Sequence, residues 1–371
     1  MPRKILTVVG ARPQFVKAAI VSRAISRRSS LREILVHTGQ HHDSAMSQVF
    51  FDELGLAAPH ENLGIAGGSH GEQTGRMLAG LETVMQRERP DWVLIYGDTN
   101  STLAGALAAA KLNIPVAHVE AGLRSWNRAM PEEVNRVVAD HLSSHLFPPT
   151  DVATANLLRE GKTKGEMSQV GDVMYDATLA FTAVARQKGN LLRAMRLEAK
   201  GYALATVHRQ ENVDDPARLG AIVEALGTLS AELPVVLPLH PRARKELAQR
   251  EDLVASASKV RIVDPVGYLD MLLLEQGARV IMTDSGGVQK EAFFHGVPCV
   301  TLRTETEWTE LVDAGWNVLA APGDAAAIVS SGRNALGFDA SRPRPLLYGA
   351  GDASERIASF FSEQRQETKR L

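Results

Sequence analysis

Residues 284 to 291 read Asp284-Ser285-Gly286-Gly287-Val288-Gln289-Lys290-Glu291, between an apolar run at 279–283 and a helical pattern from residue 292. A strand that turns through Ser-Gly-Gly directly into a helix presents bare backbone N–H groups and a positive dipole end, which suit a phosphate. Glu291 comes round on the first turns of that helix, and we interpret it as the acceptor of a ribose diol. The stretch therefore predicts a nucleotide site in an α/β fold. The alternative is a plain tight turn capped by Ser285.

Short apolar strands alternate with helical patterns along nearly the whole chain. Strands that are apolar on both faces are typical of parallel sheets covered by helices, so the pattern predicts α/β, doubly wound, Rossmann-like sheets. The expected strands are 5–10, 33–38, 92–96, 115–119, 145–147, 203–208, 235–240, 260–263, 280–283 and 299–302. The expected helices include 15–26, 72–86, 101–111, 131–143, 216–229 and 270–276.

A chain of 371 residues exceeds what one hydrophobic core usually supports, so two domains are expected. The strand rhythm breaks near 171–200, which places the first domain at 1–171 and the second at 172–352. The amphipathic helix at 353–371 is expected to cross back to the first domain.

Composition narrows the class of partner. A formal net charge of −2 argues against a nucleic-acid partner, and no apolar run approaches the roughly 20 residues of a membrane span. The single cysteine, Cys299, is expected to pack in a core, so neither a disulfide framework nor zinc spacing is possible. These features predict a cytoplasmic protein.

Polar residues gather where the expected strands end, which is where ligands bind in open parallel sheets. Two facing sets predict an active site in the interdomain cleft, with carboxylates on one side and phosphate-binding groups on the other. The first domain contributes Arg12, Lys17, Asp98, Glu120 and Glu132, and the second His208, Arg209, His240, Arg242 and Ser285.

Arg12 and Lys17 are a candidate anion clamp, with surface charge as the alternative. His208 with Arg209 is a second phosphate candidate, whereas His240 could belong to a structural loop. No G-x-G-x-x-G follows any strand and no P-loop is present, so a dinucleotide cofactor is not expected. Adjacent histidines rarely bind one ion together, so 41–42 predicts no metal site.

Three carboxylates, Asp98, Glu120 and Glu132, stand at strand or helix starts of the first domain. Each alone is more often a cap or an ion-pair partner, and Asp98 could cap the helix that follows it. Together in a cleft they suit acid–base chemistry on a neutral sugar.

Six motifs stand in order along the chain: Gly10-Ala-Arg12-Pro13, Gly97-Asp98-Thr99, His118-Val-Glu120-Ala-Gly-Leu-Arg124, Pro131-Glu132-Glu133-Val-Asn135-Arg136, His208-Arg209 and Asp284 to Glu291. They resemble the non-hydrolysing UDP-N-acetylglucosamine 2-epimerases. The resemblance implies a glycosyltransferase-B-like pair of domains, usually a homodimer, that acts without metal or nicotinamide. It implies catalytic roles for Asp98, Glu120, Glu132 and His208. It places UDP on Arg12, Ser285, Gly286 and Glu291, with Lys17, Gln73, Arg136, Arg209, His240 and Gly287 as further substrate-binding candidates.

The chemistry agrees with that assignment. The C2 proton of the sugar is barely acidic until UDP leaves C1, so elimination of UDP to a 2-acetamidoglucal and its re-addition is the expected route. A leaving diphosphate needs electrostatic stabilisation, and the proton transfers need carboxylates. The expected reaction interconverts UDP-GlcNAc and UDP-ManNAc for cell-surface polysaccharide precursors.

Other substrates and activities stay open at this point. The stretches 67–76, 97–105 and 306–315 resemble the branch that acts on UDP-2,3-diacetamido-2,3-dideoxy-glucuronate, the alternative substrate. Its extra carboxylate could pair with Arg76, Arg124, Arg128 or Arg303. A glycosyltransferase of the same fold is the rival from another enzyme class, a UDP-sugar sensor is a third possibility, and a hydrolysing epimerase is a variant of the first.

Overall fold

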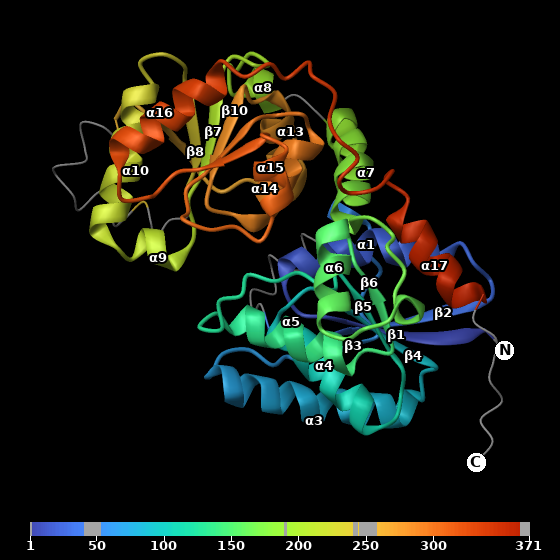
Figure 1. Cartoon of the computed structure of the whole chain (residues 1–371). Helices are drawn as coiled ribbons and strands as arrows, with labels where there is room; N and C mark the ends of the chain where they lie inside the picture. The colour runs from blue at the N-terminus through green and yellow to red at the C-terminus, as the bar shows by residue number, and fades with distance from the viewer. Residues whose placement is uncertain (1, 41–52, 189–190, 240–243, 245–257, 364–371) are drawn as a thin grey trace. The chain divides into compact units, whose positions relative to one another are not determined.

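The computed structural model describes residues 2–40, 53–188, 191–239, 244 and 258–363. The chain forms two compact units, the first made of Met1–Leu179 with Leu346–Leu371 and the second of Ala180–Pro345 (Figure 1). Each unit is built around a six-stranded sheet, and every strand pairing within it is parallel.

In the first unit the strand order is β3-β2-β1-β4-β5-β6. Helices α3, α4 and α5 lie along one face, and α1 and α17 pack together on the other (Figure 1). The strands are β1 (Arg3–Val9), β2 (Leu31–His37), β3 (Glu61–Asn62), β4 (Trp92–Tyr96), β5 (Val116–Val119) and β6 (His145–Phe147). The helices are α1 (Arg12–Ser26), α3 (His70–Glu88), α4 (Asn100–Lys111), α5 (Pro131–Leu142), α6 (Asp151–Arg159) and α17 (Ala353–Glu363).

In the second unit the order is β12-β11-β10-β7-β8-β9. Its strands are β7 (Ala203–Thr206), β8 (Val235–Pro238), β9 (Arg261–Val263), β10 (Val280–Thr283), β11 (Cys299–Thr301) and β12 (Asn317–Leu319). Its helices are α8 (Leu191–Ala194), α9 (Gln210–Val213), α10 (Pro216–Leu229), α13 (Tyr268–Gly277), α14 (Gly286–Phe294), α15 (Thr309–Asp313) and α16 (Ala325–Leu336). A further helix, α7 (Val173–Lys188), runs across the boundary between the units.

Burial explains why the central strands carry apolar side chains on both faces. Ala203 and Ala205 of β7 belong to one buried cluster, whereas Leu204 between them belongs to another. A central strand covered by helices on both faces therefore needs an apolar side chain at each residue. Cys299 is buried in the second of these clusters, as expected.

The expected domain boundary at 171/172 and the structural division differ. The division falls inside α7, and the chain returns to the first unit at Leu346. Asp176 joins these segments, since its carboxylate accepts hydrogen bonds from the Ser354 backbone N–H and hydroxyl, both at 2.7 Å. Helix α17 then packs on α1, where Arg28 lies 2.9 Å from Glu355.

The ten expected strands are all present with ends within two residues of those predicted, and β3 and β12 were missed. Helix α1 begins at Arg12, three residues before the predicted start. Among the described residues, no helix is both long and apolar enough to cross a membrane.

Candidate functional site

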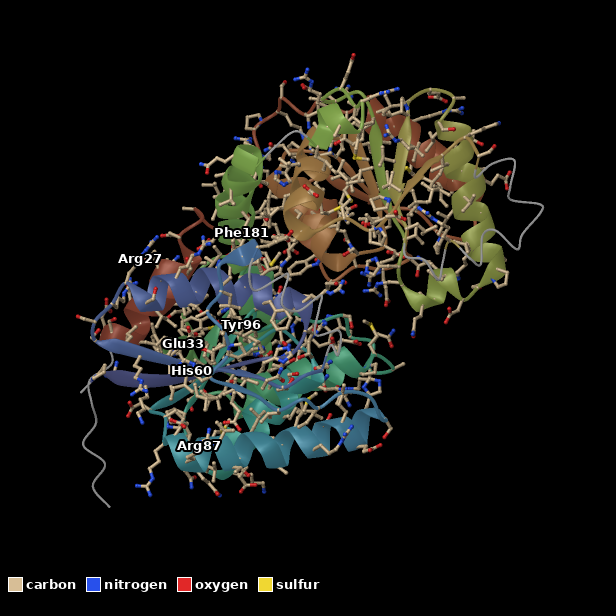
Figure 2. All side chains as sticks on the ribbon, turned by 180° about the vertical axis from the view of Figure 1, so that it is seen from behind. Arg27, Glu33, His60, Arg87, Tyr96 and Phe181 are labelled. Carbon is tan, nitrogen blue, oxygen red and sulfur yellow. The ribbon has the colours of Figure 1, made fainter. Side chains whose placement is uncertain are left out.

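The candidate residues of the first unit surround the carboxyl ends of β4 and β5. Tyr96, the last residue of β4, is fully buried inside this unit (Figure 2). Its carbonyl accepts hydrogen bonds from Gln14 at 2.9 Å and from Thr102 at 2.7 Å. The strand end that precedes Gly97 and Asp98 is therefore held from both α1 and α4.

Glu120 follows β5 with a φ of 70°, a left-handed conformation that side-chain-bearing residues rarely adopt. Its Oε2 forms an ion pair with Nζ of Lys17 from α1. Gly97 leaves room for this pair, because a Cβ at Gly97 would lie 3.2 Å from the Glu120 oxygen and 3.5 Å from the Lys17 nitrogen. The structure thus brings two predicted residues into direct contact, with Lys17 bound to a carboxylate.

A buried histidine ties the two loops together. The Nδ1 of His118 lies 2.7 Å from Oδ1 of Asp140, and its Nε2 lies 2.7 Å from the carbonyl oxygen of Gly97. Oδ2 of Asp140 accepts hydrogen bonds from the Gly122 N–H at 3.0 Å and from Arg124 at 2.7 Å. One carboxylate therefore fixes the loops that carry Asp98 and Glu120.

The pKa of Asp140 is set by its burial and by its partners in this network. Burial alone would raise the pKa of Asp140, but the hydrogen bond and charge of His118, with the Arg124 guanidinium, lower it below the usual range. Asp140 is then an ionised acceptor, and the Gly97 carbonyl can only accept. Both ring nitrogens of His118 thus lie within hydrogen-bond distance of an oxygen acceptor, and these two contacts orient the ring.

Asp98 is paired with Arg136 of α5, and the same guanidinium lies 3.1 Å from Glu133. Asn135 also donates to the Asp98 carbonyl at 2.9 Å. The alternative role for Asp98, as the cap of α4, is excluded, because Thr99 is the N-cap and accepts the backbone N–H of residue 102. Asp98 is left with its carboxylate on Arg136.

The two adjacent glutamates of α5 differ in environment. Glu132 is exposed, whereas Glu133 is 2% exposed. Glu133 accepts the backbone N–H of Ser125 at 2.9 Å and of Trp126 at 3.0 Å, in addition to Arg136. Glu133 therefore orders the 125–130 loop, a role that the sequence pattern of two neighbouring glutamates could not assign.

Gln73 of α3 is buried and accepts a hydrogen bond from Asn100 at 2.9 Å, and Asn100 in turn accepts from Asn135 at 3.2 Å. Gln73 thus connects with the loop of Asp98 through a chain of amides. Arg12 is the first residue of α1 and is half-buried.

In the second unit, Asp284 at the end of β10 organises the loop after β7. It accepts the backbone N–H of His208 at 3.1 Å and of Arg209 at 3.0 Å, and the Asn212 amide at 3.1 Å. The His208 ring lies 3.1 Å from the same carboxylate and is mostly exposed. Burial raises the pKa of Asp284, but His208 and these hydrogen bonds lower it overall. Asp284 was absent from the candidates although it directly follows a strand.

Ser285 caps α14 by accepting the N–H of Val288 at 3.4 Å, so the strand-to-helix turn predicted from the sequence is present. A Cβ at Gly286 would lie 2.4 Å from Glu307 Oε1, so a larger residue here would require the Glu307 side chain to move. Gly287 has more space around it, and Glu291 is 5% exposed on the same helix. His240, and the pair at 41–42, lie outside the described residues.

Within the described part of the chain, no group of three or more His, Cys, Asp or Glu side chains is arranged to hold a metal ion.

Comparisons with known proteins cover both units. A family model described as UDP-N-acetylglucosamine 2-epimerase matches residues 23–362. The chain is 51% identical to the UDP-2,3-diacetamido-2,3-dideoxy-D-glucuronate 2-epimerase of Pseudomonas aeruginosa, over 97% of its own length and 99% of the relative's. It is also 51% identical to a UDP-N-acetylglucosamine 2-epimerase homolog of Methanococcus maripaludis, over 85% and 88% of the two lengths.

Among solved structures, the UDP-GlcNAc 2-epimerase of Methanocaldococcus jannaschii in complex with UDP-GlcNAc and UDP matches with a TM-score of 0.88 and 42% identity. The match covers 98% of this chain and 100% of that one. It confirms the doubly wound α/β sheets predicted from the alternating pattern, and the glycosyltransferase-B-like pair of Rossmann-like units that the family resemblance implied.

Proposed function

Because the chain belongs to the UDP-N-acetylglucosamine 2-epimerase family, and is therefore a UDP-sugar 2-epimerase and an isomerase, we propose that its substrate is UDP-2,3-diacetamido-2,3-dideoxy-glucuronate. The supporting observation is the 51% identity, across almost the full length of both chains, to a relative named for that substrate. The Methanococcus relative is as similar in identity but over a smaller share of both chains. The stretches 67–76, 97–105 and 306–315, which resemble the same branch, favour the diacetamido sugar over the UDP-GlcNAc expected first.

The proposed reaction breaks the C1–O bond and leaves its electron pair on UDP. A base removes the proton from C2, and the electron pair of the C2–H bond forms a double bond between C1 and C2, which gives a glucal. A proton is then delivered to the opposite face of C2, and the diphosphate oxygen re-forms its bond to C1. Atoms and electrons balance without an oxidant or an outside nucleophile.

The leaving UDP needs positive charge and hydrogen-bond donors. We assign this role to Arg12, His208 and Arg209, with the N–H groups that begin α14 at Ser285 and Gly286. Glu291 is assigned to the ribose hydroxyls. In support, Asp284 fixes the His208 backbone through a hydrogen bond, so the exposed ring stands on an ordered loop.

The proton transfers are assigned to Asp98, Glu120 and Glu132. Asp98 and Glu120 each form an ion pair, with Arg136 and Lys17 respectively. Glu132, which is exposed, has no such partner in the described part of the chain. The ion pairs fix the positions of Asp98 and Glu120, whereas the Glu132 side chain is exposed to solvent. The homodimer and the supply of a cell-surface polysaccharide precursor belong to the same proposal, and sedimentation velocity tests the dimer.

Proton NMR in D₂O tests the function. The purified protein is given UDP-2,3-diacetamido-glucuronate or UDP-GlcNAc, without an acceptor. We expect deuterium at C2 and growth of the manno epimer with the first substrate, at a higher kcat/KM than with the second. Equal or better turnover of UDP-GlcNAc would overturn the substrate assignment. Asp98→Asn, which keeps the size of the side chain, serves as the inactive control.

A further inference from the structure

Glu275 of α13 is a buried carboxyl group that the proposed reaction does not use. It is 0% exposed, and apart from the Glu291 carboxyl neither of its oxygens has a hydrogen-bond partner in the described part of the chain. Burial, and after it the neighbouring Glu291, raise the pKa of Glu275 well above its usual value. An isolated buried carboxylate is costly, so the group must be neutral or compensated.

Among the described residues, the basic side chain recorded beside Glu275 is a histidine. His295, one turn after Glu291, places Nε2 3.9 Å from Glu275. Burial, with the charges of Lys200, Arg186 and Arg344, lowers the pKa of His295 to about 3, so the ring is neutral at pH 7.

Two further titratable groups near Glu275, Cys299 and Tyr202, are uncharged at pH 7. Burial raises the pKa of Cys299 to about 12, and burial also raises the pKa of Tyr202. Lys290, on the same helix as Glu291, lies over the Trp308 ring at 3.9 Å from its centroid. Two carboxyl groups that meet in such surroundings hold one proton between them, because both cannot ionise at close range.

We propose that Glu275 is a positioning residue, a neutral carboxylic acid that donates a hydrogen bond to Glu291 and holds that carboxylate for the ribose diol of a uridine nucleotide. The proton resides on Glu275 because Glu275 is the more deeply buried of the two, with Glu291 5% exposed. The inference rests on the proposed function in assigning Glu291 to the ribose. It makes binding of the nucleotide depend on a proton that is far from the reacting sugar.

The test compares Glu275→Gln, whose amide still donates to Glu291, with Glu275→Leu, which cannot. UDP affinity is measured by calorimetry on the full-length protein. We expect the Gln variant to bind UDP within about threefold of the parent and the Leu variant to bind about tenfold more weakly, the loss typical of one hydrogen bond to a charged group. With 2′,3′-dideoxy-UDP, which lacks the diol, the parent and both variants should bind alike.

A loss by Glu275→Leu that is equal for UDP and its dideoxy analogue would overturn the proposal, as would a Gln variant as weak as the Leu variant. The pH profile gives a second readout. UDP affinity of the parent should fall toward alkaline pH as the shared proton leaves, while Glu275→Gln shows no such fall; parallel profiles would contradict the proposal.

Glu291→Ala distinguishes a failure of the role proposed for Glu275 from a failure of the assignment of Glu291 to the ribose. If that change leaves the preference for UDP over dideoxy-UDP intact, the ribose assignment itself fails. If it abolishes the preference while Glu275→Leu does not alter it, only the role of Glu275 fails. Epimerase turnover, measured separately by NMR, decides the substrate.

Discussion

Lys17 of α1 and Glu120 after β5 form an ion pair in which the Lys17 ammonium donates to Oε2 of the carboxylate. The two side chains are only 8% and 11% exposed. The sequence suggested that Lys17 is half of an anion clamp, but its ammonium group is paired with the carboxylate of Glu120. Its more direct role is to hold Glu120, whose backbone is already in a left-handed conformation.

Lys17→Met should therefore reduce kcat much more than it weakens UDP binding. Removing one partner of a buried pair leaves an uncompensated charge, so we expect a loss of about 3 kcal/mol in unfolding free energy. Steady-state kinetics and UDP calorimetry check the split. The double variant with Glu120→Gln should recover part of the stability, and a large rise in the UDP Kd with unchanged kcat would instead support the clamp.

The neighbouring residues Glu132 and Glu133 offer a matched pair of substitutions. Glu132→Gln should lower kcat by a hundredfold or more, on the order of general acid–base catalysis, while stability changes by less than about 0.5 kcal/mol. Glu133→Gln should cost about 2 kcal/mol, because it weakens bonds to Ser125, Trp126 and Arg136. Urea unfolding and NMR turnover of both variants measure this. A stable, fully active Glu132→Gln would remove that residue from the mechanism.

Protection of β4 and β5 against hydrogen exchange should fall in acid because of Asp140. Its pKa is lowered in the folded state, so its contribution to stability is present above the unfolded value near 3.8 and is lost as the pH falls through the folded pKa. A single carboxyl group changes stability by at most about 1.4 kcal/mol per pH unit. Asp140→Asn should be less stable at pH 7 and should respond less to acid.

Hydrogen–deuterium exchange of peptides from β4 and β5, measured by mass spectrometry and corrected for intrinsic exchange rates, reports the protection of these two strands. Peptides from β10 serve as the internal control. They end beside Asp284, whose pKa is also lowered and which lies in the other unit, so their response to acid should be the same in the Asp140 variant and the parent. If the variant and the parent lose protection equally as the pH falls below about 4, Asp140 is not the group responsible.

The sequence predicted the strands well because a buried parallel strand is apolar on both faces. It missed β3 and β12, which have two and three residues and lie at sheet edges, because such short segments show no periodicity. The positions of the site residues at strand ends could also be predicted from the sequence. The side chains that they contact could not be predicted, because Lys17 pairs with a residue 103 positions away and Asp284 with one 76 positions away.

Such pairings depend on the order of strands in the sheet. β1, β4 and β5 are neighbours in space, which brings α1 beside the end of β5, but nothing in the local pattern states this order. The same holds for Glu275 and Glu291, which meet across two helices. Local sequence thus predicts where polar groups stand along the chain, and the sheet topology determines which of them meet.

Of the four arginines considered for the extra carboxylate of the diacetamido sugar, three are engaged. Arg124 binds Glu160 and Asp140, Arg76 donates to the carbonyl of residue 67 at 2.7 Å, and Arg303 lies 3.0 Å from Glu307. Arg128 is exposed on the 125–130 loop and makes no hydrogen bond or ion pair in the described part of the chain. Arg128 is therefore the arginine whose charge is available for a substrate.

Arg128→Gln should raise the KM for UDP-2,3-diacetamido-glucuronate about tenfold, as expected for one charge-assisted hydrogen bond, and leave the KM for UDP-GlcNAc nearly unchanged. Initial rates with both substrates measure the ratio, and Arg76→Gln is the matched control, for which we expect no change in that ratio. The 125–130 loop precedes the exposed Glu132, so a guanidinium carried on it stands on the same segment as a proposed acid–base residue. A variant that loses activity on both substrates alike would show that Arg128 supports the loop and does not bind the carboxylate of the diacetamido sugar.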